Sequence, residues 1–154
     1  MQKQAITITG KDFQKIRQEI KKHSEKTNDK KIIFYSDNDE LNRKIIEKEK
    51  IDVLLINQAN RKDFQKQRNS GLNHVLAKIA KKNKIKIGIN LDEIIESNHI
   101  QKAKILARII QNIELCKKNK VYMEFIQNKY KRDIYDLKSL GLVLGMPTWM
   151  TKEL

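Results

Sequence analysis

The sequence predicts an α/β fold in which parallel β-strands alternate with α-helices in a single domain spanning residues 1–154. Segments rich in β-branched residues alternate with segments of helical period, which is the pattern of a parallel sheet. The apolar runs of the strand segments are short and unbroken, as expected for strands covered on both faces. A hydrophobic content of 39% in 154 residues is enough to build one core.

Five strands are predicted, at residues 4–9, 31–36, 51–57, 85–90 and 121–127. A closed parallel barrel needs eight strands and usually about 250 residues. Five or six strands therefore give either a small open sheet or a shortened, incomplete TIM-barrel-like fold. In the second case, the exposed edges of the sheet need a partner or a second copy to cover them.

Apolar periodicity and capping residues place helices between these strands. The first helix begins near Gly10 and ends around Thr27 and Asn28. Asp37 precedes the second helix and has Glu40 three positions on, as in a capping box. A third helix is predicted at 71–83, a long one at 98–119 and a last one at 135–144. We expect Val75 to point inward from the third helix, and Ala103, Leu106, Ala107, Ile110 and Ile113 to do so from the long one.

The charge of the chain makes a polyanion the expected partner. Lys and Arg number 33 and Asp and Glu 19, which gives a net charge of +14. Each cation placed on a phosphate releases a condensed counterion, so nucleic acid is the first candidate. The alternative is compositional, because Lys, Ile and Asn are all abundant, as in A/T-rich genomes, and some lysines would then be only solvated surface.

Cysteine usage and hydropathy exclude several classes of protein. The single cysteine, Cys116, forms no internal disulfide and lacks a second cysteine with which to build a zinc site. The first residues lack an apolar run of signal-peptide length, and no run is long enough to cross a bilayer. We therefore expect a cytoplasmic protein that contacts no membrane and holds no cofactor or metal ion of its own.

One connection is much longer than the others. Residues 58–70, about thirteen of them, separate the third strand from its helix, whereas such connections usually take about 2–6 residues. The connection follows the carboxyl end of a parallel strand, where α/β folds place their ligand sites. It carries four cations, Arg61, Lys62, Lys66 and Arg68.

The end of this connection has the composition of a phosphate-binding turn. Arg68 offers a forked donor, Ser70 can cap the next helix or donate to a phosphate, and Gly71 lets the backbone approach closely. His74 stands one turn into the helix, with Lys78 on the same basic face. The alternative is that Ser70 is only an N-cap and Arg68 only a surface residue.

Five stretches of the chain carry a family resemblance: RNSGLNHVLA at 68–77, IGINL at 87–91, KAKILAR at 102–108, DLKSL at 136–140 and LGM at 144–146. Together they resemble the ribonuclease P 30 kDa subunit family, also called ribonuclease P protein component 3. The resemblance covers roughly residues 30–146. Arg68, Ser70 and His74 match the motif of the family, and Lys104 and Arg108 match its basic helix.

This resemblance implies a TIM-barrel-like protein that has no active site of its own and assists an RNA enzyme. That RNA removes the 5′ leader from precursor tRNA, and the RNA is expected to use Mg²⁺. Family members pair with ribonuclease P protein component 2, so a heterotetramer is one expected assembly and a homodimer another. The family is longer than this chain, which adds to the expectation of an incomplete barrel.

We therefore predict a noncatalytic, RNA-binding subunit of ribonuclease P that contacts precursor tRNA only indirectly. Phosphate contacts are expected to dominate binding. The residues predicted to bind RNA are Arg61, Lys62, Lys66, Arg68, Ser70, His74, Lys78, Lys104 and Arg108, with Lys129, Lys131 and Arg132 as a second patch.

Two other classes of function stay open. In a protein-interaction module, the open sheet edge and the long connection would bind another subunit, and the charge would only keep the chain in solution. In a metal-dependent phosphoesterase, to which the family is distantly similar, several His and Asp ligands would converge on metal ions. Only His23, His74 and His99 are available for that, so we expect no hydrolase activity from the chain itself.

Overall fold

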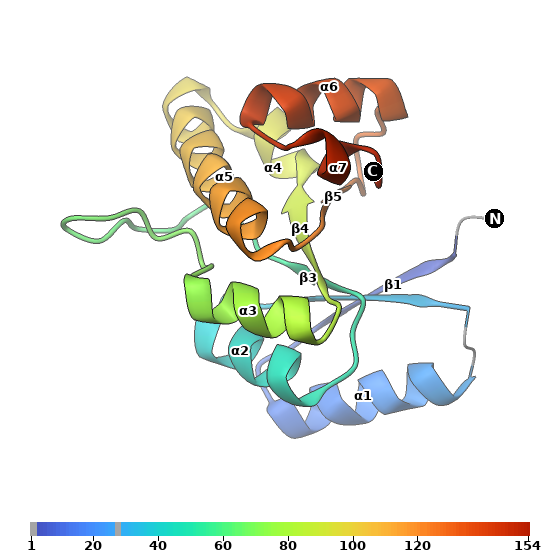
Figure 1. Cartoon of the computed structure of the whole chain (residues 1–154). Helices are drawn as coiled ribbons and strands as arrows, with labels where there is room; N and C mark the ends of the chain where they lie inside the picture. Colours follow the sequence, from blue (N-terminus) through green and yellow to red (C-terminus); the bar gives the residue numbers. More distant parts are fainter. Residues whose placement is uncertain (1–2, 27–28) are drawn as a thin grey trace.

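The computed structural model shows one open sheet of five parallel strands in the order β1-β2-β3-β4-β5 (Figure 1). It describes residues 3–26 and 29–154. The strands are β1 (Ala5–Thr9), β2 (Lys31–Tyr35), β3 (Val53–Leu55), β4 (Lys86–Asn90) and β5 (Met123–Ile126). All five predicted strands are present and each runs parallel to its neighbour, which confirms the α/β class.

The helices are α1 (Phe13–Lys26), α2 (Asp39–Lys48), α3 (His74–Lys82), α4 (Leu91–Glu96), α5 (His99–Asn119), α6 (Ile134–Leu144) and α7 (Thr148–Thr151). The sequence did not predict α4 and α7, because helices this short show little periodicity. The predicted end of the first helix, at Thr27 and Asn28, lies outside the described residues. Within the described ranges, no helix is long and apolar enough to cross a membrane.

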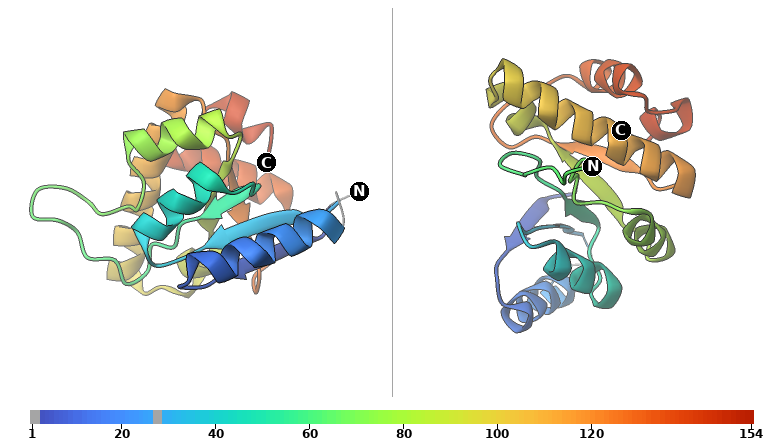
Figure 2. Two further views of the ribbon diagram at one scale, coloured as in Figure 1. Left: turned by 90° about the horizontal axis from the view of Figure 1, so that it is seen from below. Right: turned by 90° about the vertical axis from the view of Figure 1, so that its left-hand side faces the viewer.

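The helices cover only one face of the sheet (Figure 2). On that face the strands contribute to a large core that also contains residues from each helix, α1 to α7. Phe34, Leu54 and Ile87 are fully buried within it. The opposite face carries a small separate cluster of strand residues only, namely Ile33, Val53, Leu55 and Ile126, with Tyr35 beside them.

The face without helices is concave. Lys31 on β2 forms an ion pair with Glu124 on β5, three strands away, where a flat sheet would separate the two strands by about 14 Å. The hollow has a volume of about 770 Å³, and the side chains of Ala5 and Thr7 on β1 line it. The sheet is thus an open part of a barrel, as the incomplete TIM-barrel-like fold requires. Burial on both faces holds for β3 but is wrong for β1, whose concave side is exposed.

Two helices begin later than the sequence predicts. Asn38, not Asp37, caps α2, because its side-chain oxygen accepts from the backbone amides of Glu40 and Leu41 at 3.0 and 3.1 Å. In the same way, Asn73 caps α3, so that this helix begins at His74 and not at Gly71. Asparagine fills both caps where the prediction had favoured aspartate and serine.

The buried faces of α3 and α5 also differ from the prediction. Val75 and Ile110 are exposed, and the inward face of α5 contains Arg108 and Asn112. Apolar periodicity could not find this face, since two polar side chains occupy it. They are buried because hydrogen-bond acceptors from the β3–α3 connection surround them.

Candidate nucleic-acid interface

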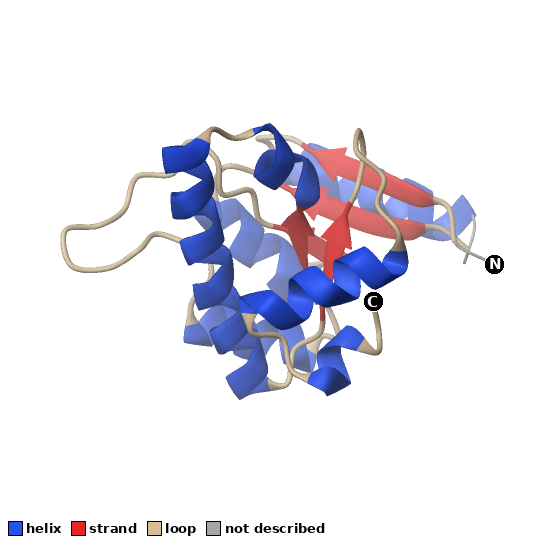
Figure 3. Cartoon of the chain, turned by 90° about the horizontal axis from the view of Figure 1, so that it is seen from above, coloured by secondary structure: helices blue, strands red, loops and turns tan. Residues whose placement is uncertain are grey.

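Both predicted basic segments leave the carboxyl edge of the sheet (Figure 3). The first is the connection between β3 and α3, residues 56–73, which extends away from the body of the molecule. We call its residues 64–68 the tip. The second is the connection between β5 and α6, residues 127–133. The first turn of α4, which follows β4 directly, contacts the backbone of both.

Two adjacent acidic residues of α4 hold the two basic segments in place. Glu93 accepts from the backbone amides of Gln58 at 2.8 Å and Ala59 at 3.2 Å, at the start of the first segment. Asp92 accepts from three successive amides of the second segment, those of residues 128, 129 and 130, at 3.3, 3.0 and 3.1 Å. A single helical turn therefore fixes where both groups of cations begin.

The two carboxylates differ in how easily they ionise. Burial alone would raise the pKa of Asp92, but the three backbone amides outweigh it, and the pKa lies below its ordinary value. Burial dominates for Glu93, and its pKa is raised although two backbone amides and Arg61 oppose the change. Asp92 therefore stays ionised to a lower pH than an ordinary aspartate, because its amide donors favour the charged form.

Residues 57–63 of the first segment, which we call its base, surround the side chain of Arg108. Arg108 is buried there and does not face solvent. Its side chain is 4% exposed and donates to the backbone oxygens of Gln58 at 3.0 Å and Arg61 at 2.9 Å. Its Nε also donates to Asp63 Oδ1 at 2.9 Å. All three guanidinium nitrogens are therefore hydrogen-bonded within the protein, and the RNA contact at Arg108 stays a prediction.

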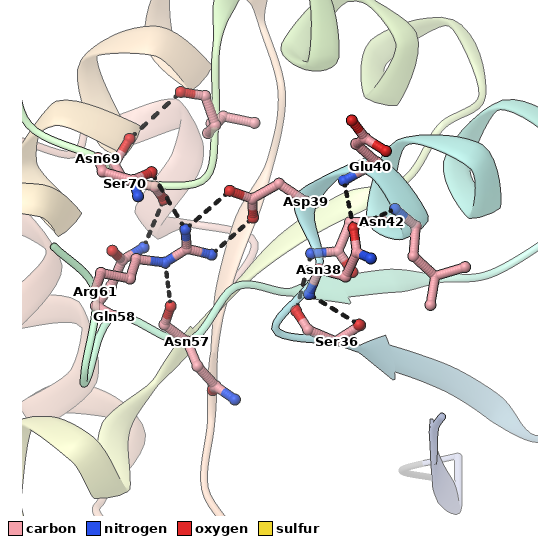
Figure 4. A network of polar contacts seen from close by, with 12 residues as sticks. Ser36, Asn38, Asp39, Glu40, Asn42, Asn57, Gln58, Arg61, Asn69 and Ser70 are labelled. Carbon is pink, nitrogen blue, oxygen red and sulfur yellow. Dashed lines mark hydrogen bonds and ion pairs between the residues drawn. The ribbon is translucent and has the colours of Figure 1, made fainter. Parts of the chain in front are cut away.

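Arg61 also stabilises the base of the first segment (Figure 4). Its guanidinium forms a two-pronged ion pair with Asp39 at 2.9 and 3.1 Å, and its Nε donates to the backbone oxygen of Asn57 at 2.7 Å. The side chain is 11% exposed, and the RNA contact at Arg61 stays a prediction. Gly71, with φ of +74°, leaves room for this guanidinium, since a Cβ there would lie 2.5 Å from an Arg61 nitrogen.

Ser70 is likewise structural. Its hydroxyl is buried and donates to the backbone oxygen of Leu72 at 3.4 Å, and its own carbonyl accepts from Gln58 Nε2 at 2.8 Å and Asn112 Nδ2 at 3.2 Å. The prediction of an N-cap is wrong for this residue, because Asn73 caps α3. The single hydroxyl proton of Ser70 is used within the protein, and its phosphate contact stays a prediction.

Asp63 closes the segment into a short loop. One of its oxygens, Oδ1, accepts from the Arg108 side chain and from the backbone amide of Asn69, each at 2.9 Å. The hydrogen bond from Arg108 is the main cause of a lowered pKa for Asp63, with the Asn69 amide second. The five tip residues between these contacts, Phe64 to Arg68, are all exposed.

Three cations of this segment remain at its surface, namely Lys62, Lys66 and Arg68, which we call the exposed loop cations. In the described part of the chain, none of the three forms an ion pair, unlike Arg61 and Arg108. The structure therefore divides the predicted basic loop into two buried arginines that build it and three cations that face solvent.

A groove of about 380 Å³ runs between the tip and the helices beside it. It brings Arg68, Ser70 and His74 together, as the sequence predicted, and the Ser70 hydroxyl is bonded there to the Leu72 carbonyl. Arg43 of α2 and Phe64 of the tip, which the sequence did not indicate, also line the groove. Their sequence positions give no signal, because the groove joins elements far apart along the chain.

The remaining predicted residues lie elsewhere. Lys78 and Lys104 are exposed on α3 and α5, and Lys104 lines a separate hollow of about 330 Å³. Lys129 is paired with Glu96 at 2.9 Å, a contact that raises the pKa of the lysine, and it lies 5.2 Å from the centre of the Tyr130 ring. The second patch is completed by Lys131 and Arg132, both exposed. It does not line the groove.

Metal ligands do not converge anywhere in the described ranges, where no group of three or more His, Cys, Asp or Glu side chains could hold an ion. Cys116 is buried in the core, and this burial raises the pKa of its thiol to about 12. The groove beside the tip therefore offers cations, amides and the ring of Phe64.

Comparison with known proteins shows what this chain is similar to. The chain is 27% identical over 150 residues to ribonuclease P protein component 3 of Methanococcus maripaludis strain C6, covering 97% of this chain and 60% of the relative. The protein of the same name from Methanocaldococcus jannaschii is 26% identical over 151 residues, 96% of this chain and 62% of the relative. These matches confirm the resemblance to ribonuclease P protein component 3. No family model matches the chain.

The solved structures agree with this component 3 likeness. A chain in the cryo-EM structure of archaeal ribonuclease P with mature tRNA superposes with a TM-score of 0.80 at 26% identity, over 96% of this chain and 62% of that chain. The chain thus spans about 60% of the component 3 proteins that it matches. Its sheet has five parallel strands, whereas a full TIM barrel has eight.

Proposed function

We propose that this chain is a noncatalytic protein subunit of ribonuclease P, which supports the catalytic RNA in removing the 5′ leader from precursor tRNA. One observation carries the proposal: nearly the whole chain matches component 3 in sequence, and also matches a chain of an archaeal ribonuclease P in structure. The site supports it, because the surface offers cations on a rigid base and not a set of reactive side chains.

The exposed loop cations are the proposed phosphate contacts. Their base is fixed by Arg108, Arg61 and Glu93, so little conformational freedom is lost when they meet the RNA. The other exposed members of the predicted set are proposed to extend this surface, namely His74, Lys78, Lys104, Lys129, Lys131 and Arg132.

The partners follow from the resemblance. We propose ribonuclease P RNA and protein component 2 as direct partners, precursor tRNA as an indirect one and the cytoplasm as the place of action. The Mg²⁺ ions needed for cleavage are proposed to bind the RNA. Exposed apolar side chains on α6, at Tyr135, Leu142 and Val143, support a protein contact there. Light scattering of the purified mixture separates a heterotetramer from a homodimer.

Reconstituted cleavage of precursor tRNA tests the proposal. Ribonuclease P RNA is combined with component 2 and with either the wild-type chain or the variant Lys62→Ala/Lys66→Ala/Arg68→Ala. We expect the wild-type chain to raise the cleavage rate and the variant to lose most of that gain. The matched control is Lys15→Ala/Lys22→Ala/Lys26→Ala, which removes the same charge from the exposed face of α1 and should behave as wild type.

Three outcomes would contradict the proposal. Cleavage of precursor tRNA by the purified chain without RNA would assign the chemistry to the protein. Phosphatase activity with added Mn²⁺ would favour the phosphoesterase class. A loop variant that keeps RNA binding and cleavage but no longer pairs with component 2 would favour the protein-interaction module.

A further inference from the structure

Phe64 is an exposed aromatic residue in an otherwise polar segment. Its side chain is 59% exposed at the tip, and it belongs to neither hydrophobic core. The other residues of the tip are polar, in the order Gln65, Lys66, Gln67 and Arg68. A lone phenylalanine in such a segment adds nothing to the core that would explain its presence there.

The loop holds this ring in a defined place. Asp63, the residue just before it, accepts from the Arg108 side chain and from the Asn69 amide, each at 2.9 Å. One end of the tip is thus bonded to the buried Arg108 through Asp63, and the other end is bonded to Asp63 through the Asn69 amide. The tip itself extends beyond the helices (Figure 1). The aromatic face is presented to solvent by a base that does not need to fold on binding.

The surroundings of the ring suit a nucleotide. Phe64 lines the groove of about 380 Å³ together with Arg43, Arg68 and His74. A base has an aromatic face that stacks on phenylalanine, and its phosphate carries the charge that the neighbouring cations bind. The amides of Gln65 and Gln67 add donors and acceptors that match the edges of bases.

We propose that the tip binds an unpaired ribonucleotide, with the base stacked on Phe64 and the flanking phosphates on Lys66 and Arg68. This inference rests on the proposed function and adds to it the kind of RNA that the loop selects. The bases of a duplex are covered by their neighbours, so only a loop, bulge or strand end can offer a free face to the ring. A protein contact is less favoured, since lysine and charge are depleted at the centre of protein interfaces.

Three variants at position 64 separate stacking from simple apolar contact. Binding of the full-length chain to a short hairpin RNA with an unpaired loop is compared for wild type, Phe64→Ala, Phe64→Leu and Phe64→Tyr, with Ile100→Ala as the control. Stacking predicts a loss of roughly 5- to 150-fold in affinity for Ala and Leu, and near wild-type affinity for Tyr. Ile100, which is 73% exposed on α5, lies outside the groove, so its variant should bind as wild type.

A fluorescence measurement reports the contact directly. In a Trp149→Phe background, Phe64→Trp places the sole tryptophan of the chain at the tip. We expect its emission to be quenched by the hairpin RNA and not by the same sequence annealed into a blunt duplex of similar length.

The outcomes distinguish the two proposals. If Phe64→Ala binds as wild type while the loss of Lys66 and Arg68 weakens binding, the chain still binds RNA and the stacking proposal is overturned. If Phe64→Leu retains affinity, or if component 2 and not RNA quenches the tryptophan, the ring makes an apolar contact and stacking is again overturned. If neither the wild-type chain nor any variant binds RNA, the proposed function fails as well.

Discussion

The base and the tip of the β3–α3 connection use the same residue types for opposite purposes. At the base, Arg61 and Arg108 donate to backbone oxygens and carboxylates and are almost fully buried. At the tip, Lys66 and Arg68 face solvent, and neither is paired with an acidic side chain in the described ranges. A cation therefore stabilises the fold when carbonyl groups surround it, and is available to a ligand when they do not.

The largest expected effect concerns the base. Arg108→Met leaves the backbone oxygens of Gln58 and Arg61 without a donor, and should lower the free energy of unfolding by about 3 kcal/mol. Lys104→Met, one turn earlier on the exposed face of α5, should change it by less than about 0.5 kcal/mol. Urea unfolding measures both. Equal stability of the two variants would show that the hydrogen bonds of Arg108 do not stabilise the fold.

The next largest effect concerns the close approach at Gly71. Gly71→Ala combines a left-handed backbone, φ of +74°, with a Cβ that would lie 2.5 Å from an Arg61 nitrogen and 2.8 Å from an Ile56 carbon. We expect a loss of about 2 kcal/mol in the free energy of unfolding. The loss should be smaller in an Arg61→Ala background, because part of the clash is removed. Strict additivity of the two substitutions would contradict this packing.

A smaller effect concerns the second basic segment and depends on pH. The folded pKa of Asp92 is lowered from the ordinary 3.8, so its contribution to stability is present above about pH 4 and is lost as the pH falls through the folded value. Asp92→Asn should therefore flatten the acid limb of the stability curve and cost about 1 kcal/mol at neutral pH. Glu96→Gln, which removes only a surface ion pair with Lys129, should leave that limb unchanged.

The sequence was sufficient for the fold because its signals are local. Strand periodicity, helix caps and the length of the 58–70 connection all depend on neighbouring residues, and each located its element to within a few positions. The predicted end of the last helix, at residue 144, is also where α6 ends, just before the αL glycine Gly145. The short helices α4 and α7 escaped because a turn or two of helix contains too little period to detect.

The site was predicted only in part, because it is formed by contacts between residues far apart in the sequence. Which arginines are buried depends on Asp39 and Asp63, which lie 22 residues before Arg61 and 45 before Arg108. The roles of Asp92 and Glu93 depend in the same way on amides more than 30 residues away. Net charge does not distinguish the cations of the loop, whereas the fold separates them into buried arginines and exposed loop cations.

The salt dependence of binding to ribonuclease P RNA tests the central claim most directly. If the exposed loop cations neutralise phosphates, the logarithm of the affinity falls with the logarithm of the salt concentration, by about 0.7–0.9 for each contact. We predict that Lys62→Ala/Lys66→Ala/Arg68→Ala reduces this slope by about 2–3, and that the matched α1 variant leaves it unchanged. An equal slope for both variants and the wild-type chain would contradict the account.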